Sequence, residues 1–364
     1  MGLSCGIVGL PNVGKSTLFN ALTSARVEAS NYPFCTIDPN VGIVRVPDPR
    51  LDRIAEMVKP KKVTPATIEF VDIAGLVRGA SKGEGLGNQF LGHIKQVDAI
   101  AHIVRCFDDP NIVHVEGAVN PKRDIDTIHI ELCLADLETV TKALDRVSKQ
   151  AKSGDKLLLA KASTYTLVRD ALATGKSVRS LTLSCEQWLH IRELQLMTAK
   201  PTLYICNVGE ENLGKPNSYL ETVREIANAE GAKVVEVSAK VEAEIAELSL
   251  EERSTFLKDL GLAESGLDRV IRASYELLNL ITYFTAGEQE CRAWTILKGT
   301  KAPQAAGIIH TDFERGFICV EIYHCNDLFT YGSDTGVRTK GLLRLEGKEY
   351  VMQDGDVVHF RFNV

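Results

Sequence analysis

The fold of this chain is decided by the stretch Gly9-Leu10-Pro11-Asn12-Val13-Gly14-Lys15-Ser16. It follows the pattern G-x-x-x-x-G-K-[ST] and lies between an apolar run, Ser4–Val8, and a helical pattern at 17–22. In this setting the pattern predicts a phosphate-binding P-loop, because its glycines let backbone N–H groups close around phosphate oxygens at the start of a helix. Lys15 is then expected to reach the β- and γ-phosphates of a nucleotide, and the Ser16 hydroxyl to ligate Mg²⁺.

The chain around this loop alternates apolar runs with turn and helix signals, as a parallel βαβ sheet requires. The expected strands are Ser4–Val8, 66–71, 99–104, 202–206 and Lys233–Val237. Ligands of open α/β sheets bind at the carboxyl ends of the strands, and most of these runs end at a polar motif. The sequence therefore predicts the α/β class, with a Ras-like G domain.

A second phosphate-sensing element, Asp72-Ile73-Ala74-Gly75, follows the strand expected at 66–71. It fits the D-x-x-G pattern, in which the Asp holds the metal, usually through water, and the glycine N–H senses the γ-phosphate. Thr36 lies in the loop before it, where a switch threonine would ligate Mg²⁺; the alternative is an ordinary loop residue. The predicted metal ligands are Ser16, Thr36 and Asp72.

The base-reading motif departs from that of a GTPase. Asn207-Val208-Gly209-Glu210 stands where N-K-x-D is usual, so a valine replaces the lysine that packs along guanine and the carboxylate arm is one carbon longer. Each lost buried hydrogen bond costs about 1–3 kcal/mol, which for two bonds is enough to erase a guanine preference. We therefore expect ATP as the nucleotide. Ser238-Ala239-Lys240 matches the S-A-K loop that packs beside the base.

Long helical patterns interrupt the alternation after the third expected strand. Residues recur there at steps of three and four, with Val140 and Val147 widening the stripe: Ile130, Leu134, Leu137, Thr141, Leu144 and Ser148. Ser184-Cys185-Glu186-Gln187 predicts a capping box. We interpret 121–199 as a helical, partly coiled-coil hairpin inserted into a G domain of 1–279; alternatively it is an arm that only covers the sheet. From about residue 280 the sequence is rich in β-patterns, which predicts a separate small binding domain, 280–364.

The charge of the chain is unevenly distributed. Its 364 residues carry a net charge of −6, which argues against coating of nucleic acid by bulk charge. Residues 121–200, however, hold 13 Lys and Arg against 10 Asp and Glu, a net charge of +3, whereas the rest of the chain carries −9. This segment is either a contact for a polyanion such as RNA or a solvated helix face.

A cytoplasmic location is expected, with no membrane partner. No apolar stretch approaches the roughly 20 residues of a membrane span, and the N-terminus begins with a strand pattern in place of a signal peptide. The nine cysteines show no CxxC spacing, which indicates reduced thiols, with Cys5 and Cys206 in the core.

Over essentially its whole length the chain resembles the YchF family of Obg-like ATPases, within the Obg branch of translation-associated P-loop GTPases. The resemblance rests on the P-loop, on the glycine-rich segment 75–87, on Asn207–Glu210, on the helical insertion and on the segment 310–317. That last segment is similar to a TGS domain, a ubiquitin-like β-grasp module. The resemblance implies ATP in place of GTP, Mg²⁺ dependence and association with the ribosome or its subunits. The competing interpretations are a GTPase of the Obg group and a P-loop small-molecule kinase.

The motifs do not identify the residue that orients the attacking water. Leu76 stands where Ras-type proteins place the glutamine that orients the attacking water, and leucine cannot do so. We expect slow intrinsic turnover, because a missing arginine finger alone can forfeit roughly 10³–10⁵ in rate. Candidates for holding the water are His114, His93 and Arg78, since histidine can do so near neutral pH.

Asn12 has two interpretations of its own: it helps to bind K⁺ beside the phosphates in the role of an arginine finger, or it only braces the loop. The predicted catalytic residues are Lys15, His114 and Asn12. The predicted nucleotide-binding residues are Asn12, Val13, Gly14, Lys15, Ser16, Thr17, Gly75, Asn207, Val208, Glu210, Ser238 and Ala239.

Overall fold

The computed structural model describes residues 3–24, 40–74, 86–114 and 117–363. The chain forms two compact units, of which the first comprises Met1–Gly42 with Glu69–Ser274 and the second comprises Ile43–Ile68 with Tyr275–Val364. The predicted G domain, 1–279, and C-terminal domain, 280–364, remain proposals about independently folding parts of the chain. The compact units differ from them chiefly in adding 43–68 to the second unit.

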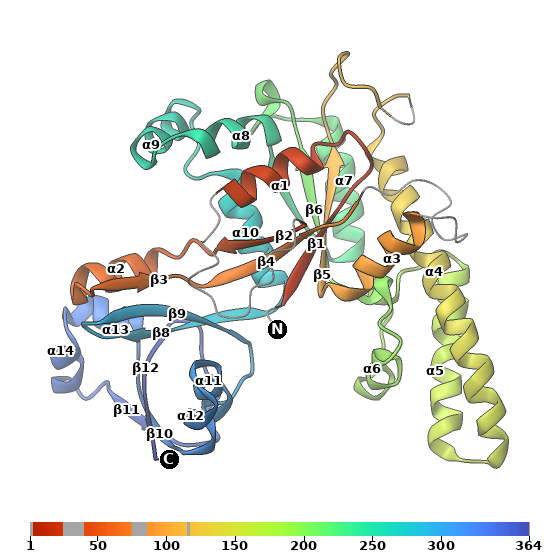
Figure 1. The fold of residues 1–364 in the computed structure, drawn as a ribbon. Coiled ribbons are helices and arrows are strands. Elements are labelled where there is room, and N and C mark those ends of the chain that lie inside the picture. Colours follow the sequence, from red (N-terminus) through yellow and green to blue (C-terminus); the bar gives the residue numbers. More distant parts are fainter. Residues whose placement is uncertain (1–2, 25–39, 75–85, 115–116, 364) are drawn as a thin grey trace. The chain divides into compact units, whose positions relative to one another are not determined.

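A six-stranded sheet with the strand order β2-β4-β1-β5-β6-β7 organises the nucleotide-binding half of the chain (Figure 1). Its strands are β1 (Ser4–Val8), β2 (Val41–Arg45), β4 (Thr67–Asp72), β5 (Ala99–Arg105), β6 (Thr202–Asn207) and β7 (Lys233–Val237). β1 pairs in parallel with β4 and β5, and β6 pairs in parallel with β5 and β7. β1, β5 and β6 are buried along their whole length, as central parallel strands between helices must be. The α/β prediction is confirmed.

Helices connect these strands and lie along the sheet. They are α1 (Lys15–Ser24), α3 (Leu86–Gln96), α7 (Ser218–Glu230), α8 (Ala239–Glu247), α9 (Leu250–Asp259) and α10 (Gly266–Leu277). α1 packs with α8, which brings the P-loop helix beside the helix that begins in the S-A-K loop. The P-loop and the S-A-K loop are therefore followed by neighbouring helices.

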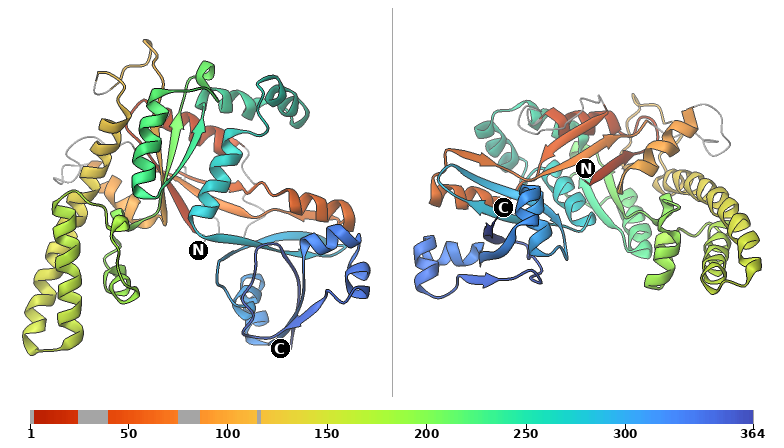
Figure 2. Two further views of the ribbon diagram at one scale, coloured as in Figure 1. Left: turned by 180° about the vertical axis from the view of Figure 1, so that it is seen from behind. Right: turned by 60° about the horizontal axis from the view of Figure 1, so that its bottom comes forward.

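The predicted helical hairpin is present, and its buried face is largely the predicted one, apart from Ile130 and Leu134. α4 (Pro121–Gln150) and α5 (Lys156–Ala173) lie side by side in both views of Figure 2. α6 (Cys185–Arg192) begins with the expected capping box. Ile130 and Leu134 are 52% and 45% exposed. The α4 residues that pack in the core of the hairpin follow the four-three spacing of a coiled coil, and all but Cys133 belong to the predicted face: Cys133, Leu137, Val140, Leu144 and Val147.

The second unit is built on a mixed sheet of the order β11-β10-β12-β8-β9-β3. Its strands are β3 (Lys62–Thr64), β8 (Leu280–Ala286), β9 (Glu290–Leu297), β10 (Phe317–His324), β11 (Arg344–Glu346) and β12 (Asp356–Phe362). Its helices are α2 (Pro49–Val58), α11 (Ala302–Ile309), α12 (Thr311–Arg315), α13 (Cys325–Tyr331) and α14 (Asp334–Thr339). Alanines of α11 pack on Tyr283, Ile322 and Phe360 of the sheet. A mixed sheet packed on one helix is the arrangement that the β-grasp prediction requires.

The segment 43–68 belongs to this second unit through specific contacts. β3 pairs in parallel with β9, and the Arg50 guanidinium forms an ion pair of 2.6 Å with Asp354. The Arg53 guanidinium lies 4.3 Å from the centre of the Phe329 ring. Sequence patterns alone assigned this segment to the G domain, because contacts between residues so distant in the chain leave no local signal.

Two expectations concern the chain as a whole. Within the described ranges, no helix combines the length and the apolar character that a membrane span requires. The cysteines of the described residues are all free thiols, and Cys5 and Cys206 are fully buried, as predicted.

Candidate functional site

The P-loop connects β1 to α1 through two residues with left-handed backbone conformations. Asn12 has φ 61° and Gly14 has φ 94°. A Cβ atom on Gly14 would lie 2.3 Å from Nδ2 of Asn207, so only glycine fits there. The Leu18 N–H donates to the Gly14 carbonyl at 3.0 Å, which begins α1 directly after the loop. This leaves the first N–H groups of the helix pointing toward the site, where they suit an anion.

Lys15 and Asp72 meet at the carboxyl ends of β1 and β4. Lys15 is the first residue of α1, Asp72 is the last residue of β4, and the strand register pairs Ile7 with Asp72. The Lys15 ammonium contacts Oδ1 of Asp72, and the two side chains are only 11% and 20% exposed. The predicted phosphate-binding cation and metal-binding carboxylate are therefore adjacent.

The oxygen donors beside the P-loop suit a Mg²⁺ ion whose remaining ligands are phosphate oxygens and water. In the described part of the chain, no group of three or more His, Cys, Asp or Glu side chains could hold a metal ion. The exposed Ser16 on the first turn of α1 and the Asp72 carboxylate supply hard oxygen atoms. Mg²⁺ is commonly held by one or two such groups together with phosphate oxygens and water. Thr36 and Gly75 lie outside the described residues.

The Asn207 side chain connects the P-loop to the S-A-K loop by two hydrogen bonds. Its Nδ2 donates to the Val13 carbonyl at 2.8 Å, and its Oδ1 accepts from the Ala239 N–H at 2.9 Å. The side chain is buried, and both of its polar ends are used. The geometry thus ties the P-loop to the start of α8, which holds Val13, Gly14 and Ala239 in fixed relation.

The two residues that replace the guanine-reading pair have different environments. The Val208 side chain is 2% exposed and packs in an apolar cluster with Val104 and Cys106, so it does not extend along a base. Glu210 is 46% exposed, and its Oε2 lies 3.3 Å from Nζ of Lys240 in the S-A-K loop. This contact raises the pKa of Lys240 above its usual value.

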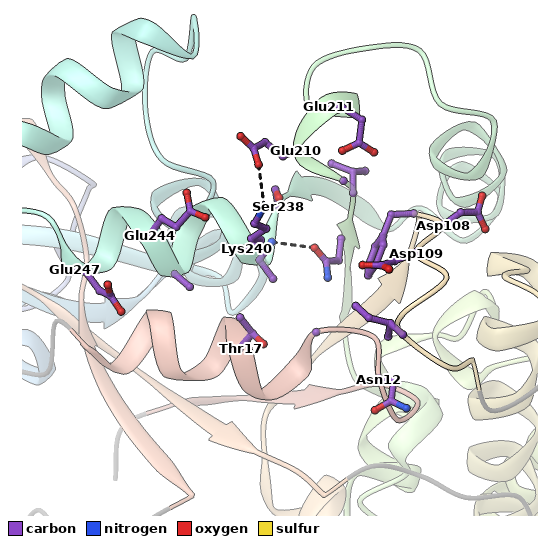
Figure 3. A pocket seen from close by; sticks show the side chains of 18 residues that line it. Asn12, Thr17, Asp108, Asp109, Glu210, Glu211, Ser238, Lys240, Glu244 and Glu247 are labelled. Carbon is purple, nitrogen blue, oxygen red and sulfur yellow. Dashed lines mark hydrogen bonds and ion pairs between the residues drawn. The ribbon is translucent and has the colours of Figure 1, made fainter.

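A cavity of about 660 Å³ opens between these elements (Figure 3). This volume suits a ligand of nucleotide size. Among the described residues that line it, six are carboxylates and Lys240 is the one Lys or Arg. Its lining residues outside the predicted set come mainly from the loop after β5 and from α8: Phe107, Asp108, Asp109, Ile112, Ala243, Glu244 and Glu247. The loop after β5 escaped the sequence analysis because it matches no motif.

His114 is held by the helical insertion. Its Nε2 lies 2.9 Å from Oδ2 of Asp124, in the first turn of α4, and both side chains are 3% exposed. The neighbouring Val113 carbonyl accepts from Nδ2 of Asn12 at 3.1 Å. The alternative candidate His93 is exposed near the end of α3, and Arg78 lies outside the described residues. The structure thus places Asn12 next to His114, whereas the cavity lining includes Asn12 without His114.

Comparisons with known proteins cover the whole chain. Residues 280–363 match the family model YchF-GTPase_C, described as a protein of unknown function, and residues 4–152 match the model MMR_HSR1, described as a 50S ribosome-binding GTPase. The chain is 58% identical over 366 residues to the ribosome-binding ATPase YchF of Bacillus subtilis and 58% identical over 364 residues to that of Escherichia coli O157:H7, each comparison covering 100% of both chains. It is also similar to the solved structure of the Schizosaccharomyces pombe YchF GTPase, with a TM-score of 0.90 and 42% identity over 99% of this chain and 98% of that one.

Proposed function

The chain belongs to the YchF family, and we therefore propose that it is a Mg²⁺-dependent P-loop ATPase of the Obg branch that acts as a nucleotide-controlled switch at the ribosome. It would hydrolyse ATP to ADP and phosphate in the cytoplasm. The observation that carries the proposal is the contact of Lys15 with Asp72 at the strand ends, next in sequence to Gly14, which lines the cavity. The names of the similar proteins support the ribosome as partner.

The phosphate chemistry follows from the Lys15–Asp72 pair. The Lys15 ammonium and the Asp72 carboxylate carry opposite charges and are in contact. Lys15 would reach the β- and γ-oxygens of a bound triphosphate. Ser16, Asp72 and Thr36 would hold the metal, and the Gly75 N–H would contact the γ-phosphate. Bound Mg²⁺ would supply neutralisation of the charge on the phosphates. Lys15 and the N–H groups of the P-loop stabilise the same charge as it develops during transfer.

In the part of the cavity expected to hold the base, adenine is favoured because two hydrogen-bond donors of the lining already have protein partners. Guanine presents a carbonyl oxygen where adenine presents an amino group, so guanine needs a hydrogen-bond donor at that place. The Ala239 N–H is used by Asn207, and Lys240 is paired with Glu210. The carboxylates of the lining accept from the amino group of either base and from the N1–H of guanine, so the preference rests on the committed donors. This balance supports ATP over GTP.

His114 is the proposed water-positioning residue. Asp124 fixes its imidazole by one hydrogen bond, which orients the ring as a carboxylate partner orients a catalytic histidine. Asn12 donates to the carbonyl before His114, which supports the bracing role. A K⁺ ion beside the phosphates remains part of the proposal, and replacement of K⁺ by Na⁺ in the hydrolysis assay tests it.

Phosphate release from Mg²⁺–ATP is expected to be slow and to fall to the background rate when EDTA removes the metal, because Lys15 alone leaves most of the phosphate charge uncompensated. His114→Ala is expected to lower kcat by about a hundredfold, the lower range for a positioned acid–base group. Its ATP affinity should stay within about twofold, since His114 does not line the cavity.

His93→Ala is the matched comparison, because His93 is exposed and its loss should leave kcat near that of the parent. Release that survives EDTA would contradict the metal site. A larger kcat loss in His93→Ala than in His114→Ala would assign the water-positioning role to His93 in place of His114.

A further inference from the structure

Arg105, the last residue of β5, is a buried cation outside every motif discussed so far. Its side chain is among the largest that are fully buried, with the residue 2% exposed. Within the described part of the chain it forms no ion pair with a carboxylate. A buried charge of this kind is costly unless hydrogen bonds satisfy it.

All three nitrogen atoms of the guanidinium donate to the loop that follows β5, residues 106–113, called the β5 loop below. Nε donates to the Phe107 carbonyl at 3.1 Å, and Nη1 donates to the Ile112 carbonyl at 3.0 Å. Nη2 donates to the Asp109 carbonyl at 3.4 Å. One side chain therefore fixes the beginning, the middle and the end of a loop that has no regular secondary structure.

Three other side chains also donate hydrogen bonds to the β5 loop. Nδ2 of Asn217 donates to the Cys106 carbonyl at 2.9 Å, and the Tyr219 hydroxyl donates to Asp108 at 2.9 Å. Nδ2 of Asn12 donates to the Val113 carbonyl. Arg105 supplies donors to three of the loop's backbone carbonyls from one planar group.

The β5 loop forms part of the cavity wall and leads directly to His114. Phe107, Asp108, Asp109 and Ile112 line the cavity, and His114 follows the loop directly. The Arg105 guanidinium also lies 4.6 Å from the centre of the Phe107 ring, a cation–π contact that fixes the ring. A change in the loop would therefore displace the wall of the cavity and the peptide that carries His114 together.

We propose that Arg105 is a positioning residue for ATP hydrolysis, which sets the shape of the β5 loop and through it both the base-side wall and the placement of His114. This inference rests on the proposed ATPase function. Arg105 lines no part of the cavity and acts only through the loop. Its loss should weaken ATP binding and slow turnover together, whereas loss of His114 should slow turnover alone.

Arg105→Lys is the sharpest variant, because it keeps the charge and removes the planar fork that spans three carbonyls. We expect the Kd for labelled ATP to rise at least about fivefold, the equivalent of one lost hydrogen bond. kcat should fall at least about tenfold, because small misplacements of catalytic groups are costly. The control is Arg179→Lys, the same change at a side chain that pairs with Glu230 at 2.7 Å outside the cavity, which should leave both values within twofold.

The melting temperature of each variant separates positioning from stability. An Arg105→Lys protein that is less stable, yet binds and hydrolyses ATP like Arg179→Lys at a temperature where both are folded, would overturn the proposal. A parent chain that does not bind ATP would instead overturn the proposed function. If Arg105→Lys does not fold, hydrogen exchange of the parent decides: the Ile112 amide, bonded to the Asp109 carbonyl at 3.2 Å, should exchange slowly with and without ATP. Rapid exchange of this amide without ATP would mean that the β5 loop is not held.

Discussion

Replacing Lys15 by alanine is expected to lower Mg²⁺-dependent phosphate release by at least about a hundredfold, the loss typical of removing one preorganised group that stabilises transition-state charge. Lys15 is the first residue of the P-loop helix, and its ammonium contacts Asp72, the proposed metal-binding carboxylate. Lys240, the one Lys or Arg among the described residues that line the cavity, is paired with Glu210. Phosphate release under saturating ATP measures the effect.

The matched control is Lys258→Ala, which removes an exposed lysine from α9 and should leave the rate unchanged. The Lys15→Ala protein should keep its far-ultraviolet circular dichroism spectrum, because the lost ammonium contacts a partly exposed carboxylate and no apolar core. Hydrolysis near the parent rate in Lys15→Ala would remove the P-loop from the mechanism.

Neutralising the arm tip, residues 141–161, is expected to flatten the salt dependence of ribosome binding. This tip concentrates the charge of the insertion, with six Lys and Arg against two Asp and Glu. Each phosphate contact contributes about 0.7–0.9 to the slope of log K against log salt concentration. Replacing the exposed Lys149, Lys152 and Lys156 by glutamine should therefore reduce that slope by about 2–3, measured by co-sedimentation with ribosomal particles over a salt series.

Substitution is preferable to deletion of 121–199, because the base of the arm belongs to the nucleotide-binding half. Ile125 packs in a cluster with Val104 and Tyr204, and Asp124 holds His114. The control replaces Lys215, Lys233 and Lys258 by glutamine, which changes the net charge equally outside the arm. An equal fall in slope for both triple variants, or none in either, would contradict a contact between the arm tip and RNA. The C-terminal domain as a second, shape-specific contact stays a prediction.

Local patterns were sufficient for much of the fold. The strand runs and the P-loop depend on neighbouring residues, so periodicity and glycine placement identified β1, β4, β5, β6 and β7 before the structure was known. Most of the predicted face of α4 is confirmed, but Ile130 and Leu134 are wrong members of it, because they are apolar and lie outside the coiled-coil register. A helix with two apolar stripes does not reveal from its own sequence which stripe meets a partner.

The candidate site was less predictable where distant segments meet. The motifs located Lys15, Asp72 and Asn207, whereas the β5 loop and its support by Arg105 depend on contacts across the fold. Val208 shows a further limit: the sequence marks it as a replaced guanine contact, but its side chain is in the core. Val208 nevertheless borders the cavity, and Glu210→Asp is the single change that restores the shorter carboxylate arm of the guanine-reading motif.

Parallel equilibrium titrations of the parent chain with labelled ATP and labelled GTP, both with Mg²⁺, test the central claim most directly. ATP is expected to bind at least about fivefold more tightly, the factor for one hydrogen bond of about 1 kcal/mol, because Glu210 is paired with Lys240 and the Ala239 N–H is already committed to Asn207. Glu210→Asp, titrated alongside, should reduce that ratio. GTP affinity equal to or tighter than that of ATP in the parent would contradict the account.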